Sequence, residues 1–238
     1  MQEWPVRNIY LFVGPPGSGK GSLSQLCADK LGYIQLSVGN LCRKHIINGT
    51  AVGKEIEQAI NMGQLAPDKL IVAMVLEWLG QQEAVSSLIL DGFPRTMAQA
   101  ELFEKMINEN KQIGLLHVIR FVVSDDHLVK RLQARLVCSY TSCQAVYSMQ
   151  DQAIGAKDGI TCDRCGKSLI RRVDDEFHTI FERLAVYRHH ENDLLGFYHK
   201  KGKTVIELNA ELPLAAVFEN FSRQIVKEKS SYLMGHLA

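Results

Sequence analysis

Short apolar runs rich in β-forming residues alternate with segments of helical spacing along this chain. The five apolar runs are residues 8–13, 33–36, 87–90, 115–123 and 204–208. The segments with helical spacing are residues 19–31, 40–48, 51–62, 68–80, 96–110, 124–136, 174–201 and 214–229. Strands that alternate with helices predict an α/β fold, in which a parallel sheet carries helices on both faces.

Polar residues mark the starts of three predicted helices. Asp68 follows Pro67 and is expected to cap the helix over 68–80, and residues 124–126 are expected to cap a helix that runs to about Leu136. Asp174 and Asp175 open the long helix over 174–201, where capping is one interpretation of their carboxylates. Residues 230–238 are expected to form a frayed tail.

Residues 137–173 interrupt the alternation and have no sustained period. They contain the pairs Cys138-x4-Cys143 and Cys162-x2-Cys165, separated by 18 residues. This spacing fits a tetrahedral zinc site with four thiolate ligands, and four unrelated cysteines are the alternative. Because four thiolates leave no open position, such a zinc would be structural and would stabilise a segment too small for its own core.

The overall charge is nearly balanced. The chain of 238 residues has 27 basic and 26 acidic side chains, a formal net charge of +1. This balance gives no global attraction to nucleic acid or to a membrane surface. No apolar run is long enough to span a bilayer, and the start of the chain has no export signal. We therefore expect a cytoplasmic protein with neither a nucleic-acid nor a membrane partner.

The turn after the first predicted strand has the composition of a phosphate-binding loop. Residues 14–20 read GPPGSGK, which fits G-x-x-x-x-G-K, with Gly21 before Ser22. Glycines let backbone N–H groups approach phosphate oxygens, and the helix that follows adds the positive end of its dipole. Lys20 would supply a mobile charge to the phosphates, and Ser22 a hydroxyl to Mg²⁺ or phosphate. The alternative is an ordinary glycine-rich turn between a strand and a helix.

Four segments, taken in order, resemble the nucleoside monophosphate kinases and among them the adenylate kinases. They are GPPGSGKGS at 14–22, LSVGNLCR at 36–43, DGFPR at 91–95, and RRVDD at 171–175 followed by Arg183. The likeness runs from Ile9 to about Val226, and the cysteine insertion resembles the long lid of many bacterial adenylate kinases. The resemblance implies a P-loop NTPase-type fold and the reversible reaction ATP + AMP = 2 ADP with Mg²⁺, in a monomer that serves adenine nucleotide homeostasis.

The resemblance also implies that the chain is divided into three domains. Residues 1–36, 67–136 and 174–238 would form the core P-loop domain, residues 37–66 a small helical AMP-binding domain, and residues 137–173 a zinc-stapled lid. The two smaller parts would close over the nucleotides and exclude water, which would otherwise accept the phosphoryl group.

Transfer between two nucleotides brings two polyanions together, so it requires cations rather than a general base. The acceptor phosphate is already largely ionised near pH 7, and arginine forks bind phosphate in a bidentate manner. The resemblance implies catalytic roles for Lys20, Asp91, Arg95, Arg135, Arg172 and Arg183. Asp91 would hold Mg²⁺ through water. Asp174 and Asp175 would position lid arginines.

Nucleotide contacts follow from the same resemblance. ATP would be bound by Gly17, Ser18, Gly19, Lys20, Gly21, Ser22, Arg131, Arg135, Val146 and Tyr147. AMP would be bound by Val38, Arg43, Gln64, Leu65, Ala66, Gly92, Phe93, Pro94, Arg95, Gln99, Arg172 and Arg183. Arg131 and Arg135 are expected at positions i and i+4 on one helix face. Gln99 would read the adenine edge.

Two residues depart from the family pattern in the monophosphate site. Val38 stands where the family usually has threonine, and Asn40 where it usually has aspartate. A kinase for another monophosphate such as UMP or CMP, or one with GTP as donor, is therefore the near alternative. From other classes, a zinc-ribbon nucleic-acid-binding protein that retains a P-loop and an inactive scaffold of the same fold are the remaining alternatives.

Overall fold

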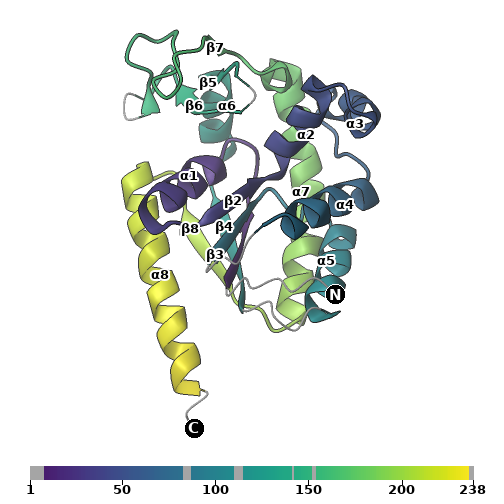
Figure 1. The fold of residues 1–238 in the computed structure, drawn as a ribbon. Coiled ribbons are helices and arrows are strands. Elements are labelled where there is room, and N and C mark those ends of the chain that lie inside the picture. The colour runs from purple at the N-terminus through teal and green to yellow at the C-terminus, as the bar shows by residue number, and fades with distance from the viewer. Residues whose placement is uncertain (1–7, 83–86, 110–114, 141, 152–153, 236–238) are drawn as a thin grey trace.

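The central element is one parallel sheet, seen in a computed structural model that describes residues 8–82, 87–109, 115–140, 142–151 and 154–235, the last ten as backbone only. Its strands are β1 (Asn8–Val13), β2 (Ile34–Ser37), β3 (Ser87–Asp91), β4 (Leu115–Val122) and β8 (Val205–Asn209). They lie in the order β2-β3-β1-β4-β8, and every neighbouring pair is parallel (Figure 1). The predicted α/β class is confirmed.

Helices cover both faces of this sheet. They are α1 (Lys20–Leu31), α2 (Val38–Ile47), α3 (Ala51–Asn61), α4 (Asp68–Gly80), α5 (Met97–Glu109), α6 (Asp125–Gln133), α7 (Phe177–Lys200) and α8 (Leu214–Gly235). Side chains alternate along a strand, so β1 supplies two cores. Ile9, Leu11 and Val13 pack with α4, α5 and the second half of α7. Tyr10 and Phe12 pack with α1 and α8 on the other face.

The cysteine insertion forms a second, smaller sheet above the first (Figure 1). Its strands β5 (Arg135–Cys138), β6 (Val146–Ser148) and β7 (Leu169–Ile170) are antiparallel in the order β6-β5-β7. The chain returns through a 3₁₀ turn, η2 (Val173–Asp175), into α7. None of the described helices has the length and apolar character needed to cross a membrane.

The helix expected to reach Leu136 ends earlier. Helix α6 stops at Gln133 with Ala134 as its C-cap, and Arg135 begins β5. Residues 135–137 pair with β6, and the Ala134 carbonyl accepts from the N–H of Met149. These sheet hydrogen bonds replace helical ones, so the prediction that Arg131 and Arg135 share one helix face is wrong.

Three predictions about helix ends are also wrong. Pro67, not Asp68, is the N-cap residue of α4, and the Asp68 carboxylate bonds to side chains of the next helix. Asp174 and Asp175 lie in η2 and bind arginines rather than cap α7, whose N-cap residue is Glu176. Helix α8 continues to Gly235, since the sequence has no glycine or proline between Ile225 and Gly235. Residues 236–238 of the expected tail lie outside the described residues.

Candidate active site

The loop after β1 requires glycine for two separate reasons. Gly17 and Gly19 have φ angles of 83° and 89°, which side chains rarely adopt. Packing excludes a side chain as well, because a Cβ on Gly14 would lie 2.8 Å from the Cβ of Phe121, and one on Gly17 2.8 Å from the Cγ of Leu132. The loop is therefore held tightly between β4 and α6, with its backbone fixed before any ligand binds.

The start of α1 is open to an anion. Its N-cap residue, Gly19, provides no side-chain hydrogen bond, so the first N–H groups of the helix have no cap. Lys20 lies folded over the loop, and its Nζ donates to the carbonyls of Gly14 and Pro15, each at 2.7 Å, and to Ser18 Oγ at 3.1 Å. Burial lowers the pKa of Lys20 to about 7. An incoming phosphate would restore the charge of this ammonium.

The carboxyl end of β3 places Asp91 beside the phosphate loop. Asp91 lies opposite Phe12 of β1 and Ser37 of β2, at the middle of this edge of the sheet. A Cβ on Gly21 would lie 3.3 Å from Asp91 Oδ2, so the carboxylate sits against the start of α1. Within the described part of the chain, no side chain or N–H group donates to it. A free carboxylate oxygen beside a phosphate loop is a suitable ligand for Mg²⁺ or its bound water.

Arg43 and Arg95 converge from two different elements. A Cβ on Gly39 would lie 3.4 Å from Nη1 of Arg43 and 3.7 Å from Nη2 of Arg95. The Arg95 Nε donates to the Gly92 carbonyl at 2.8 Å, and Arg43 donates to Asn40 Oδ1. Partial loss of hydration lowers the pKa of both arginines. Two guanidinium groups gathered around a glycine without a carboxylate between them form a site for an anion.

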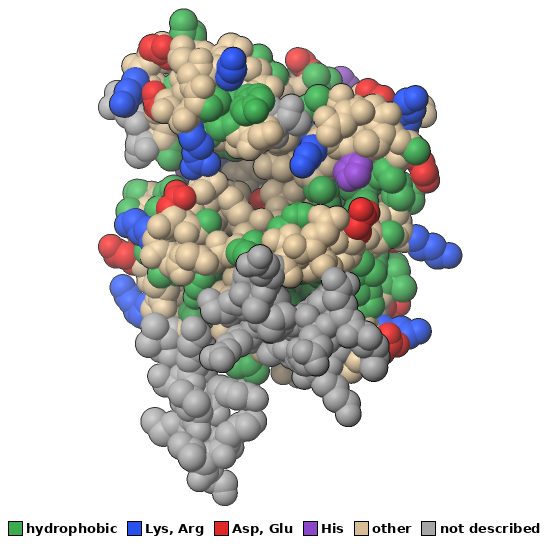
Figure 2. All heavy atoms as spheres, in the orientation of Figure 1, with side chains coloured by type: hydrophobic (Ala, Val, Ile, Leu, Met, Phe, Trp, Pro, Cys, Tyr) green, Lys and Arg blue, Asp and Glu red, His purple; other side chains and the backbone are tan. Residues whose placement is uncertain are grey.

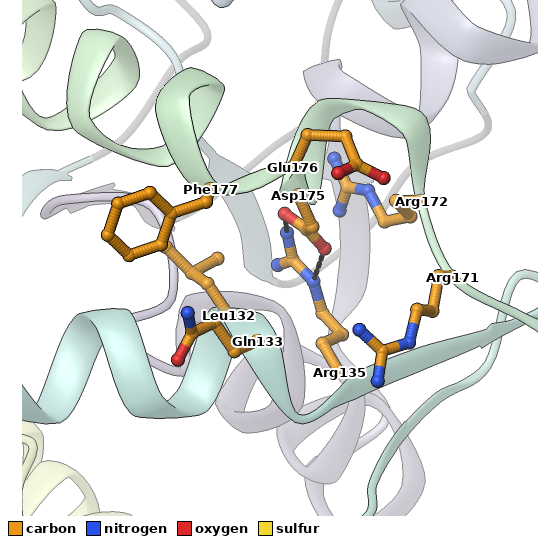
Figure 3. Close-up of a pocket in the computed structure, with 8 residues that line it drawn as sticks. All are labelled: Leu132, Gln133, Arg135, Arg171, Arg172, Asp175, Glu176 and Phe177. Carbon is orange, nitrogen blue, oxygen red and sulfur yellow. Dashed lines mark hydrogen bonds and ion pairs between the residues drawn. The ribbon is translucent and has the colours of Figure 1, made fainter.

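Three further arginines contact two aspartates with buried carboxylates where the insertion returns to α7. Figure 3 shows one of these contacts, the fork between Arg135 and Asp175. Arg135 makes a fork with both oxygens of Asp175, and Arg172 makes one with Asp174 at 2.9 and 2.7 Å. Arg183 bonds to Asp175 Oδ1 at 2.7 Å. Burial alone would raise the pKa of Asp174, but the two arginines nearest to it hold that pKa well below its ordinary value. Both aspartates thus hold arginines in place in this structure, and the role of these arginines in a lid stays a prediction.

The pocket at this point has a volume of about 150 Å³. Figure 3 shows Arg171 and Arg172 on the connection that follows β7, opposite Arg135 at the start of β5. Burial, followed by the charge of Arg172, lowers the pKa of Arg135 to about 10, which still leaves it charged at neutral pH.

The two arginine groups and the phosphate loop face one another. The Lys20 ammonium interacts electrostatically with Asp91, Arg95, Arg183 and Arg135. The Arg43 guanidinium interacts in the same way with Arg172, Arg135 and Arg183. Within the described part of the chain, six cations thus approach one region: Lys20, Arg43, Arg95, Arg135, Arg172 and Arg183. The carboxylates of Asp91, Asp174 and Asp175 accompany them, and Glu176 lines the same pocket. Arg95 is exposed and the other five cations are half-buried. Like charges gathered at one place repel one another, so bound anions would stabilise this arrangement.

The residues expected around the acceptor base lie next to this region. Gln99 is buried and accepts from the backbone N–H of Arg95 at 2.8 Å. Gly63 precedes residues 64–66 and packs on α7, since a Cβ there would lie 2.9 Å from Cγ of Arg183. Val38 begins α2 and is buried in the core. Phe93 and Pro94, joined by a cis peptide bond, are buried as well.

Three of the residues expected to contact ATP lie apart from the arginine forks. Arg131 donates to the Ala210 carbonyl at 2.8 Å, at the end of β8. In β6, Val146 is exposed, whereas the Tyr147 hydroxyl lies 3.4 Å from Cys162 Sγ. Tyr147 therefore belongs with the cysteines in this structure, and its contact with ATP stays a prediction.

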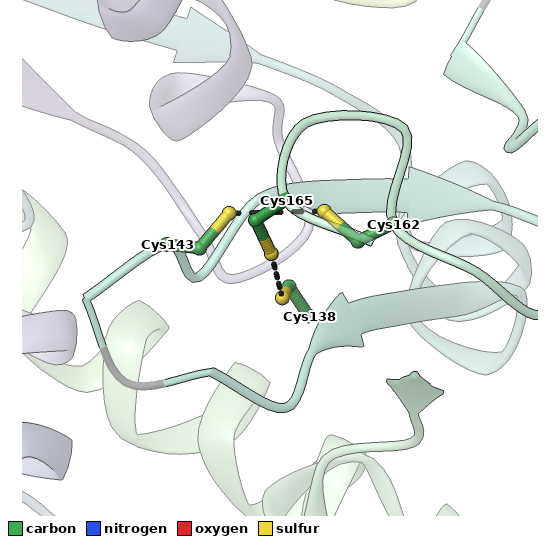
Figure 4. A group of neighbouring side chains, drawn as sticks. All are labelled: Cys138, Cys143, Cys162 and Cys165. Carbon is green, nitrogen blue, oxygen red and sulfur yellow. Dashed lines mark hydrogen bonds between the residues drawn. The ribbon is translucent and has the colours of Figure 1, made fainter. Parts of the chain in front are cut away.

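The four cysteines of the insertion meet in one cluster (Figure 4). All four Sγ atoms lie within 4.8 Å of one another, with Cys138 and Cys165 at 3.3 Å and Cys143 and Cys162 at 3.7 Å. In a tetrahedral site with Zn–S bonds of about 2.3 Å, sulfurs lie about 3.8 Å apart. All four are free thiols rather than disulfides. The cluster fits a structural zinc ion.

The insertion and the α2–α3 segment both approach the site. Arg164 of the insertion donates to Gln25 of α1 at 3.2 Å, and α3 packs against η2. The surface is hollowed between the insertion and the body that holds the sheet (Figure 2). Both contacts join parts that are far apart in sequence.

Sequence reasoning misses two polar residues of the site. In sequence Asn40 is only a departure from the family pattern, yet its Oδ1 accepts from Arg43 as an aspartate oxygen would. The position of Asp68 after a proline suggests a helix cap, yet it bonds to Thr96 and Gln99. The pattern T-x-x-Q at 96–99, which resembles a capping box, is the available signal that Gln99 has partners within the protein.

Known proteins with similar sequences agree with this geometry. The family model described as adenylate kinase matches residues 12–203. An adenylate kinase of Archaeoglobus fulgidus is 36% identical over 221 residues, which cover 92% of this chain and 99% of that protein. One of Thermodesulfovibrio yellowstonii is 40% identical over 193 residues, 81% of this chain and 87% of that protein. With a phosphate loop, two arginine groups and these relatives, the chain belongs to the adenylate kinase family.

Proposed function

We propose that this protein catalyses the reversible transfer of the γ-phosphoryl group from ATP to AMP, which gives two ADP. The observation that carries this proposal is the enclosure of one region by six cations from separate elements. Arg43 and Arg95 stand on one side, and Lys20 with Arg135, Arg172 and Arg183 on the other. Two phosphate-binding groups that face each other suit a donor and an acceptor nucleotide.

The donor phosphates would lie in the loop of residues 14–22. The uncapped N–H groups at the start of α1 would bind them, and Lys20 would leave its loop carbonyls to neutralise the β- and γ-phosphates. Asp91 would hold the Mg²⁺ that accompanies the nucleotide, and this ion neutralises phosphate charge during transfer. Arg131, Val146 and Tyr147 remain the proposed contacts for the rest of ATP.

The acceptor phosphate would bind between Arg43 and Arg95. Both side chains are fixed by neighbours, Arg43 through Asn40 and Arg95 through the Gly92 carbonyl, so their forks are oriented before the nucleotide arrives. Residues 64–66 and Gln99 would surround the base. An ionised phosphate oxygen attacks, so no side chain has to remove a proton.

Arg135, Arg172 and Arg183 would stabilise the group in transit. Asp174 and Asp175 hold these guanidinium groups in place, and the arginines keep further donors for the equatorial oxygens. Residues 37–66 and 137–173 would act as AMP-binding and lid domains that close on the core formed by the remaining residues. Closure would exclude water from the transferring phosphoryl group.

The insertion would hold one structural zinc ion through Cys138, Cys143, Cys162 and Cys165. The close approach of the four sulfurs supports this assignment. We further propose that the protein works as a cytoplasmic monomer, as the family resemblance implies. Analytical ultracentrifugation with and without nucleotide would test the monomer directly.

A coupled assay of ADP formation tests the main proposal. The purified protein should convert ATP and AMP to ADP in the presence of Mg²⁺, and Arg95→Met should lower kcat by about a hundredfold or more. Lys130→Met, a change on the exposed side of α6, is the matched control and should leave kcat unchanged. Faster turnover of UMP, CMP or GMP than of AMP would contradict the assignment of the acceptor.

The bisubstrate compound with two adenosines joined by five phosphates tests the two-site geometry. It should bind this protein much more tightly than ATP or AMP alone, since it spans both arginine groups. Binding no tighter than that of ATP would contradict a donor and an acceptor site in one region.

A further inference from the structure

The amide of Gln99 is held by the protein at both ends. Its Oε1 accepts from the N–H of Arg95 at 2.8 Å, and its Nε2 donates to Asp68 Oδ1 at 2.8 Å. A backbone N–H can only donate, and an ionised carboxylate can only accept. These two partners therefore fix which end of the amide is oxygen and which is nitrogen.

Asp68 is the centre of this arrangement. The same Oδ1 atom accepts from Thr96 Oγ1 at 2.9 Å, and Thr96 Oγ1 in turn accepts from the N–H of Gln99 at 3.1 Å. Asp68 starts α4, whereas Thr96 and Gln99 belong to the start of α5. One carboxylate oxygen from another helix thus locks both the cap of α5 and the Gln99 side chain.

The locked amide lies next to the proposed acceptor site. Arg95 gives its backbone N–H to Gln99, and its guanidinium group meets Arg43 at Gly39. The amide keeps one unshared lone pair on Oε1 and one unshared hydrogen on Nε2. A nucleotide with its phosphate at Arg95 would therefore have its base within reach of an oriented acceptor and donor.

We propose that Asp68 is a positioning residue that makes the acceptor site selective for adenine over 6-oxo purines. This inference rests on the proposed function, because it requires a monophosphate between Arg43 and Arg95. Adenine presents an N6 donor beside the N1 acceptor, whereas hypoxanthine presents an O6 acceptor beside an N1 donor. An amide of fixed orientation matches one of these patterns, and an amide free to rotate by 180° matches both.

The sequence of this chain places the discrimination on Gln99. Val38 stands where the family usually has threonine, and its side chain has no hydrogen-bonding atom. A valine cannot tell a donor from an acceptor on the base. Gln64, which is also expected near the base, has an amide as well but is exposed, so we assign the distinction to the oriented amide of Gln99 and hence to Asp68.

Kinetics with AMP and IMP test this role. Asp68→Ala should lower the ratio of kcat/KM for AMP over IMP by about tenfold, chiefly through a higher KM for AMP, with the KM for ATP within about twofold of wild type. Asp68→Asn keeps the Oδ1 atom that accepts both hydrogen bonds, so it should retain the wild-type ratio. Asp125→Ala removes an exposed first-turn carboxylate from α6 and is the matched control.

A double-mutant cycle separates positioning from support of the fold. If Asp68 acts through the amide, Asp68→Ala should leave the AMP/IMP ratio unchanged in a Gln99→Leu background. A ratio unchanged by Asp68→Ala in the wild-type background, an equal loss in Asp68→Asn, or a loss that persists in the Gln99→Leu background would overturn the proposal. If Asp68→Ala does not fold, Asp68→Ser takes its place, because a serine hydroxyl is too short to reach Gln99.

The two levels of inference fail in different ways. If wild-type protein forms no ADP from ATP and AMP, the proposed function is wrong. If wild-type protein is active and prefers AMP, but its preference does not depend on Asp68, only the positioning role is wrong.

Discussion

The buried carboxylate of Asp175 gives the sharpest test of the arginine cluster. Its side chain is only 4% exposed and accepts from Arg135 Nε, from Arg135 Nη2 and from Arg183 Nη1. In Asp175→Asn, an NH₂ group replaces one oxygen. The amide can then accept from only one side of the Arg135 fork, and the half-buried Arg135 loses its counter-charge, whereas Arg183 keeps an ion pair with Asp174 at 3.4 Å.

The magnitude follows from burial. Removal of one partner from a buried ion pair destabilises a protein by about 3–5 kcal/mol. For a chain of this length, each kcal/mol lowers Tm by about 2–4 °C, so Asp175→Asn should lower Tm by about 6 °C or more. Because Arg135 and Arg183 also lose their orientation, kcat should fall by about a hundredfold.

Calorimetry and the coupled ADP assay measure both effects. Asp125→Asn is the control, since Asp125 pairs with Arg188 on the surface, with side chains 55% and 50% exposed. Exposed pairs contribute at most about 1 kcal/mol, so this variant should melt within about 4 °C of wild type. Equal Tm values for Asp175→Asn and Asp125→Asn, or an unchanged kcat in the former, would refute the claim that Asp175 holds the arginines.

Three further predictions concern other parts of the site. Since burial lowers the pKa of free Lys20 to about 7 and bound phosphates would raise it, ATP binding at about pH 8 should take up close to one proton. Calorimetric titrations in two buffers of different ionisation enthalpy measure this uptake, and Lys20→Met should abolish it. Equal binding enthalpies for the wild type in the two buffers would contradict the predicted proton uptake. Cys162→Ser should reduce bound zinc from one ion per chain to less than about a tenth, as measured by mass spectrometry of the metal. Cys27→Ser, on the buried face of α1, should retain the bound zinc. Gly17→Ala should destabilise the protein by about 1–3 kcal/mol and raise the KM for ATP, because Gly17 has a φ of 83° and a Cβ there would lie 2.8 Å from Leu132. The control is Gly196→Ala within α7, where a Cβ would meet open space, and this change should be neutral or stabilising.

The α/β class and the chemistry of the site are encoded in local patterns of the sequence. Strand and helix periods differ enough to be read directly, so the five strands of the parallel sheet are predicted where the structure has them. The phosphate loop and the four-cysteine insertion are local patterns as well, and their function depends on residues close together in the chain. Patterns of this kind can be recognised in the sequence without knowledge of the fold.

The pairing of distant polar side chains, in contrast, is set by the packed fold alone. Arg135 leaves the helix of Arg131 because pairing with Ser148 of β6 competes with the helix for its backbone. Asp174 and Asp175 bind arginines instead of capping α7, since a buried guanidinium is a stronger partner than a free N–H group. Asp68 meets Gln99 across 31 positions of sequence. Hydrogen bonds between residues so far apart form only where the packing of α4 against α5 brings them together, and no local pattern encodes that distance.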